Sequence, residues 1–233
     1  MTACAAGPLA RRDFVRALSA GAGVAALSSG VATGLHAARP RGEPDPTPAA
    51  ALQMLYEGNA RFLQGKIMAP HRNLDRLKEV APKQAPYAAF LGCADSRVPI
   101  EIVFDQGFGD LFVTRIAGNV ADPSIIGSLE FGTLVLGARV LFVLGHTNCG
   151  AVAATMKGDA VPGQISTLYQ HIRPAVKTAA GNLDLAIVNN VKNQAETLAE
   201  ASPVIGALGK EGKLLVAGGV YDLQTGRVTP VAL

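Results

Sequence analysis

The chain has 233 residues, which suits one globular domain and a leader, and 49% of them are hydrophobic, enough for a sizeable core. The formal net charge is only +3 with histidine neutral, so the sequence lacks the basic surface of a nucleic-acid-binding protein. We therefore expect no nucleic-acid partner.

The first 38 residues have the pattern of an export signal. Arg11 and Arg12 precede the apolar Phe14, and residues 17–35 carry no charge. This pattern predicts a cleaved twin-arginine signal over 1–38, a periplasmic or secreted protein, and contact with the membrane only through the signal. A weak membrane anchor is the alternative, because the uncharged segment is barely long enough to span a bilayer.

The next ten residues, 39–48, contain four prolines and are expected to form an extended linker before a catalytic domain over 49–233. Thr47 and Pro48 fit the N-cap and first position of a helix over 49–64, which Gly65 would end. A short amphipathic helix over 72–80 is expected to follow.

The remaining chain alternates between apolar runs and helical patterns. Strands are expected over 87–92, 110–116, 139–145 and 213–220, and a short edge strand over 227–232 after a turn at 224–226. The run within 110–116 suits burial on both faces of a sheet. Helices are expected from 99, over 122–136, from 149, and as two or three helices without chemistry over 160–209. This rhythm predicts an α/β fold: a mostly parallel sheet of four strands plus the edge strand, with helices on both faces.

Metal-ligand side chains follow two of the predicted strands. Cys93 and Asp95 come after the strand at 87–92, and His146 and Cys149 come after the strand at 139–145. The carboxyl ends of parallel strands meet at one edge of a sheet, where α/β proteins place their sites. Thiolate, imidazole and carboxylate are all zinc ligands, so we predict a zinc site from Cys93, Asp95, His146 and Cys149.

A disulfide between Cys93 and Cys149 is the structural alternative. Removal of residues 1–38 would leave these two cysteines alone in the chain, and two cysteines in an oxidising compartment ordinarily suggest a bridge. A bridge gives no reason for the neighbouring Asp95, Arg97 and His146, and the zinc interpretation does.

Two motifs also resemble those of a known family. Cys-Ala-Asp-Ser-Arg at 93–97 and Gly-His-Thr-Asn-Cys-Gly-Ala-Val at 145–152 resemble the zinc motifs of the β-class carbonic anhydrases. The runs 52–62 and 104–119 resemble that family's N-terminal helix and central strand region, so the resemblance extends over about 49–221.

The resemblance implies that the chain is an enzyme of that fold with one Zn²⁺. Its reaction would be the reversible hydration of carbon dioxide to bicarbonate and a proton by zinc-bound hydroxide. A homodimer or homotetramer is also implied, in which the helix over 49–64 would clasp the partner.

The role of Asp95 has two alternatives. It would either take the fourth coordination position in a closed site, or accept a hydrogen bond from the hydroxide in an open one. Arg97 has a planar guanidinium that can pair with Asp95 through two hydrogen bonds and hold it off the metal. The resemblance assigns this catalytic pair the same role.

Two other functions are compatible with the motifs. The same zinc site could act on a related cumulene such as CS₂ or COS, because the residues at the metal would not differ. A zinc-stabilised structural or binding domain is the non-catalytic alternative, although a structural zinc site normally lacks an adjacent aspartate–arginine pair.

The twin arginines generate a first testable prediction. Changing Arg11→Lys together with Arg12→Lys should leave the precursor in the cytoplasm, because the export route reads both guanidinium groups. Cell fractionation of the tagged protein measures this. Unchanged export of the double variant, with dependence on the general secretory route, would contradict the twin-arginine interpretation.

Overall fold

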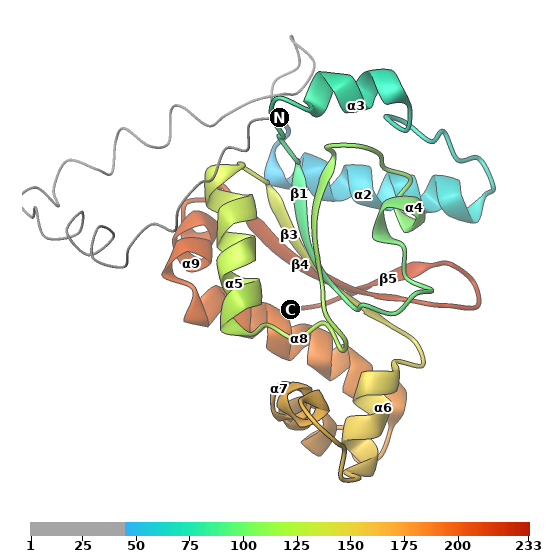
Figure 1. Cartoon of the computed structure of the whole chain (residues 1–233), viewed down its shortest axis with the longest axis vertical. Helices are drawn as coiled ribbons and strands as arrows, with labels where there is room; N and C mark the ends of the chain where they lie inside the picture. The colour runs from blue at the N-terminus through green and yellow to red at the C-terminus, as the bar shows by residue number, and fades with distance from the viewer. Residues whose placement is uncertain (1–44) are drawn as a thin grey trace, which may run out of the picture. The chain divides into compact units, whose positions relative to one another are not determined.

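The computed structural model describes residues 45–233 (Figure 1). The predicted signal over 1–38 and most of the linker over 39–48 lie outside this range. The five strands form one sheet in the order β2-β1-β3-β4-β5, parallel except for β5, which runs antiparallel to β4. The strands are β1 Ala88–Gly92, β2 Leu111–Arg115, β3 Val140–His146, β4 Leu215–Tyr221 and β5 Val228–Val231. The predicted fold class is confirmed.

Within residues 45–233, two helices precede β1, and the others lie in the connections between β1 and β4 (Figure 1). They are α2 Pro48–Leu63, α3 Leu74–Val80, α4 Ile100–Val103, α5 Pro123–Glu130, α6 Gly150–Lys157, α7 Ile165–Lys177, α8 Leu183–Ala201 and α9 Pro203–Lys210, with a π-helical turn, η1 Phe131–Val135, after α5. No helix within residues 45–233 combines the length and the apolar character that crossing a membrane requires.

Two of these helices begin where their capping residues predict. The Thr47 hydroxyl accepts a hydrogen bond from the Ala50 backbone N–H at 3.2 Å, with Pro48 at the first helical position of α2. The Asp122 carboxylate accepts from the backbone N–H groups of Ser124 and Ile125 at 2.8 and 2.9 Å, which begins α5. In both cases the side chain satisfies N–H groups that the first turn leaves unpaired.

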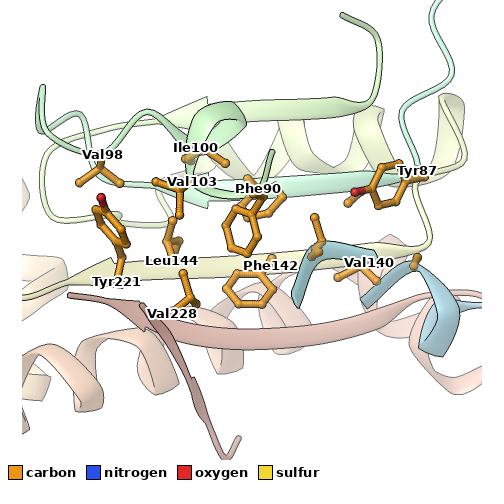
Figure 2. Close-up of a cluster of buried hydrophobic side chains, with 14 residues drawn as sticks. Tyr87, Phe90, Val98, Ile100, Val103, Val140, Phe142, Leu144, Tyr221 and Val228 are labelled. Atoms are coloured by element: carbon orange, nitrogen blue, oxygen red, sulfur yellow. The ribbon is translucent and has the colours of Figure 1, made fainter. Parts of the chain in front are cut away.

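Both faces of the central strands are buried. On one face Phe90, Phe142 and Leu144 pack in a cluster with residues of α2 and α4 (Figure 2). On the other face Leu91 and Leu141 pack against α5 and α8. Because successive side chains of a strand point to opposite faces, this double burial explains why β1 and β3 are continuous apolar runs without a polar alternation.

Two expectations about the strands need correction. The run Leu111-Phe112-Val113 was expected to be buried on both faces, but its residues are only partly buried, because β2 is an edge strand with β1 as its one neighbour. His146 was expected just after its strand and is instead the last residue of β3. The strand order also places β2 on one side of β1 and β3 on the other. This reversal of the strand order is the switch point at which open α/β sheets form a crevice.

Candidate metal centre

The two predicted motifs converge at the carboxyl ends of β1 and β3. These strands are parallel neighbours in a register that pairs Gly92 with Leu144, so Cys93 leaves the sheet close to His146. Cys149 follows in a short turn and is the N-cap of α6. The sulfur atoms of Cys93 and Cys149 and a ring nitrogen of His146 all lie within 4.8 Å of one another.

The hydrogen bonding of His146 leaves one ring nitrogen available to a metal. Its Nδ1 lies 2.9 Å from the backbone carbonyl oxygen of Thr147. A carbonyl can only accept, so Nδ1 carries the proton and Nε2 presents a lone pair. Nε2 is buried and has no hydrogen-bond partner within residues 45–233. A buried polar atom without a partner costs roughly 1–3 kcal/mol, and a cation at this position would remove that cost.

The two sulfur atoms also fit a metal. Cys93 and Cys149 are both free and buried, so the structure does not contain the alternative disulfide. A hydrogen bond from the Cys149 thiol lowers the pKa of Cys93, and the same hydrogen bond raises the pKa of Cys149. Without a cation the pair therefore favours ionisation of Cys93 and disfavours ionisation of Cys149. A divalent cation would stabilise both thiolates together, as a Zn²⁺ site requires.

Asp95 lies beside this group and is paired with Arg97. Its Oδ1 accepts from the Arg97 backbone N–H and from Nε, both at 2.9 Å, and its Oδ2 accepts from Nη2 at 2.7 Å. These hydrogen bonds hold the pKa of Asp95 well below its usual range, so the carboxylate is ionised. Its Oδ2 is 3.9 Å from His146 Nε2. The carboxylate thus lies beside Nε2 of His146 while both of its oxygens bind Arg97.

Arg115, at the end of β2, was not predicted as a site residue. Its Nε donates to the carbonyl oxygen of Cys93 at 2.9 Å, and its Nη2 donates to the carbonyl oxygen of Asp95 at 2.6 Å. These contacts tie the 93–95 loop to the neighbouring strand. A charged residue directly after the apolar run Leu111–Thr114 is the only sequence signal that could have indicated it.

The turn at 117–119 reaches the site. The backbone N–H of Gly118 donates to the sulfur of Cys93 at 3.3 Å. Behind the turn, Asn190 of α8 donates to the Gly118 carbonyl at 2.9 Å. The expectation that residues 160–209 carry no chemistry overlooked this contact between α8 and the turn.

Two further histidines of the described residues lie outside the metal centre. His71 contacts the carboxylate of Asp110 at 2.7 Å, before the start of β2. The ring of His171, on α7, lies 3.2 Å from the side-chain amide of Gln170. Neither belongs to the group formed by Cys93, His146 and Cys149.

Comparison with known proteins decides the family. The family model described as carbonic anhydrase matches residues 88–228, which is more than half of the chain. The solved β-carbonic anhydrase of Coccomyxa is 27% identical with a TM-score of 0.59, covering 81% of this chain and 87% of that one. The chain belongs to the β-class carbonic anhydrase family.

Other relatives agree with this assignment. The carbonic anhydrase of Mycolicibacterium smegmatis is 35% identical and covers 79% of this chain and 94% of its own length. Carbonic anhydrase 2 of Mycobacterium tuberculosis is 36% identical over 79% of this chain and 93% of its own. The β-carbonic anhydrase CafA of Aspergillus fumigatus has a TM-score of 0.60 at 28% identity, over 78% of this chain and 89% of that one.

The activity follows from the family and the geometry together. As a β-carbonic anhydrase, the enzyme catalyses the reversible hydration of carbon dioxide to bicarbonate and a proton, with zinc as its cofactor. The cysteine–histidine–cysteine group at the end of β1 and β3 is a fitting place for that ion.

The state of the sulfur atoms can be tested directly. When mature enzyme is purified without reductant, denatured and alkylated, Cys93 and Cys149 should both carry the label, because the fold holds both as free thiols. Peptide mass spectrometry measures this. A mass corresponding to a bridge between the two cysteines would contradict the metal-centre interpretation.

Proposed function

We propose that Cys93, His146 and Cys149 hold one Zn²⁺ per chain, and that Asp95 and Arg97 are the catalytic pair of carbon dioxide hydration. The observation that carries this proposal is the buried, unpartnered Nε2 of His146 next to two free sulfur atoms. Two thiolates and a neutral imidazole would balance the charge of a divalent ion inside a buried site.

The bound ion supplies Lewis acidity that lets water attack carbon dioxide near neutral pH. The rest of the chemistry falls to the chain's own side chains. Thr147 fixes the His146 ring through its carbonyl oxygen, which keeps Nε2 unprotonated and aimed at the site. The N–H of Gly118 supports the Cys93 sulfur from the opposite side.

Asp95 acts in this proposal as a hydrogen-bond acceptor that orients the attacking water, and not as a fourth ligand. Arg97 makes three hydrogen bonds to it, counting the backbone N–H, and occupies both carboxylate oxygens. A carboxylate held in this way has to give up charge-assisted hydrogen bonds before it can bind a metal. Arg97 would therefore keep the Asp95 carboxylate from binding the ion.

Removing Arg97 tests this role. In Arg97→Ala the carboxylate of Asp95 is free to bind the ion, so carbon dioxide hydration should fall while the zinc content stays near one per chain. Loss of a charge-assisted partner is worth about 2–5 kcal/mol, or ~30- to 4000-fold in rate. Stopped-flow hydration of carbon dioxide by the zinc-loaded mature enzyme measures it, with zinc determined on the same sample.

Two further variants make the result specific. Arg227→Ala, at an exposed arginine in the turn before β5, should hydrate carbon dioxide at the unaltered rate. Asp95→Ala should keep its zinc and lose activity because the acceptor is missing. An Arg97→Ala enzyme with zinc and near-normal hydration would show that the pair is only structural. Turnover of CS₂ or COS without carbon dioxide hydration would instead overturn the proposed substrate.

We also propose that the enzyme is a homodimer or homotetramer. Four large apolar side chains on α3 and the segment before it are exposed to solvent: Ile67, Met68, Leu74 and Leu77. Met68 and Leu74 are each 71% exposed. These four residues form the α3 apolar surface. Large exposed apolar side chains mark interaction sites when they form a continuous patch. A second copy of the chain is the proposed partner, as the family resemblance implies.

Charge placed on this surface should dissociate the assembly. Leu74→Asp puts a carboxylate at the first position of α3, where the helix itself tolerates it. Sedimentation equilibrium should then show monomers. The control Leu185→Asp makes the same substitution at an exposed position of α8 and should leave the mass of the assembly equal to that of the wild-type enzyme. A wild-type enzyme that is monomeric and fully active would overturn the proposal.

The cellular location is proposed from the sequence alone. The twin arginines and the uncharged segment at 17–35 support export of the folded enzyme to the periplasm or beyond, with residues 1–38 as its contact with the membrane.

A further inference from the structure

A chain of buried side-chain amides connects the sulfur of Cys93 to helices α7 and α8. The contact nearest the sulfur is the backbone N–H of Gly118, which donates to it at 3.3 Å. Gly118 has a φ of +76° and Asn119 a φ of +44°, so the turn holds two consecutive left-handed residues. Such a turn persists only where its surroundings fix it.

Asn190 fixes this turn from behind. Its Nδ2 donates to the carbonyl oxygen of Gly118 at 2.9 Å, and its side chain is almost completely buried. Both backbone groups of Gly118 are therefore bonded, the N–H to Cys93 and the C=O to Asn190. Without Asn190, the buried carbonyl oxygen of Gly118 would lack this hydrogen-bond donor. The free energy of the turn would then fall if the turn moved.

Gln194, one helical turn further along α8, holds Asn190 in place. Its Nε2 donates to Asn190 Oδ1 at 3.1 Å, and its Oε1 accepts from the Ala121 backbone N–H at 2.8 Å. The side-chain amide of Gln194 thus also binds the backbone at Ala121, just after the turn. With both amide atoms engaged, Gln194 also sets which way the Asn190 amide faces.

The last contact of the chain lies on α7. Gln194 Nε2 also donates to the carbonyl oxygen of His171 at 3.1 Å. Pro174 stands inside this helix and has no N–H, so the turn that precedes it lacks the helical hydrogen bond to the Gln170 carbonyl. The carbonyl of His171 lies in that turn and is accessible to a side chain of α8.

We propose that Asn190 and Gln194 are positioning residues of the zinc site, which act by holding the Gly118 N–H against the Cys93 sulfur. This inference rests on the proposed role of Cys93 as a zinc ligand. The amides touch neither the metal nor the substrate. Their effect is to keep a backbone donor on the sulfur of Cys93.

The first test measures metal binding rather than turnover. Asn190→Leu removes the hydrogen bonds of the amide to Gly118, Asn119 and Gln194 with little change in volume. Loss of an outer partner of a metal ligand typically lowers metal affinity about 10- to 100-fold, so zinc affinity in a chelator competition should fall by that factor. In the cobalt(II)-loaded enzyme the sulfur-to-cobalt charge-transfer band should move to longer wavelength, because the sulfur loses a hydrogen-bond donor.

Asn189→Leu is the matched control. It makes the same substitution at the adjacent position of α8, where the amide donates to Thr178 and not to the turn. Its zinc affinity and its cobalt band should equal those of the wild-type enzyme. Urea unfolding of each metal-free variant shows whether the fold is retained. Asn190→Ser serves if Asn190→Leu does not fold, because serine is small, polar and too short to reach the Gly118 carbonyl.

The outcomes separate this inference from the proposed function. A lower zinc affinity and a shifted band in a folded Asn190 variant, with Asn189→Leu unchanged, support the positioning role. Wild-type values for both measurements in a folded Asn190 variant overturn it. A wild-type enzyme that shows no sulfur-to-cobalt band at all would instead refute the cysteine ligands, and with them the proposed function.

Discussion

The parallel pairing of β1 with β3 is the constraint on which the metal centre depends. Their register places Gly92 opposite Leu144, and only this register brings Cys93 and His146 out at the same edge with their side chains converging. A slip by one residue would turn every side chain of a strand to the opposite face. Burial on both faces prevents such a slip, because Phe142 on one side and Leu141 on the other each pack in a separate core.

The site lies where the apolar core ends, and its polarity increases outward from there. His146 is completely buried and both cysteines nearly so, whereas Asp95 and Arg97 reach the surface. A charged ion among the buried groups requires balancing charge in place, which two sulfur atoms can provide. Arg97 lies on the outer side, where its guanidinium stays hydrated. Its carboxylate partner, Asp95, can face the interior.

The sequence predicted the fold and the converging residues because both depend on local patterns. Apolar runs followed by cysteine or histidine identify strand ends within a few residues, and parallel strands then bring those ends together. Arg115 and Asn190 could not be predicted in this way. Each binds a backbone carbonyl, which every residue has, and Asn190 lies 72 residues from its partner Gly118. A contact of that kind has neither a residue-type signature nor a spacing.

The prediction that the β2 run is buried on both faces was wrong for the same reason. Leu111–Arg115 has the composition of a central strand, but whether a strand is central or at the edge is decided by its neighbours in space. The order β2-β1-β3 puts it outermost, and nothing within the run itself records that order.

The burial of the three proposed ligands has a kinetic consequence. With His146 fully enclosed and Cys93 and Cys149 exposing 4% and 1% of their surfaces, a chelator larger than water or carbon dioxide would reach a bound ion poorly while the fold is closed. Metal exchange then proceeds through local opening of the strand ends and the 117–119 turn, and its rate is set by how often they open. The enzyme would keep its metal for long periods in surroundings poor in zinc, whatever its equilibrium affinity.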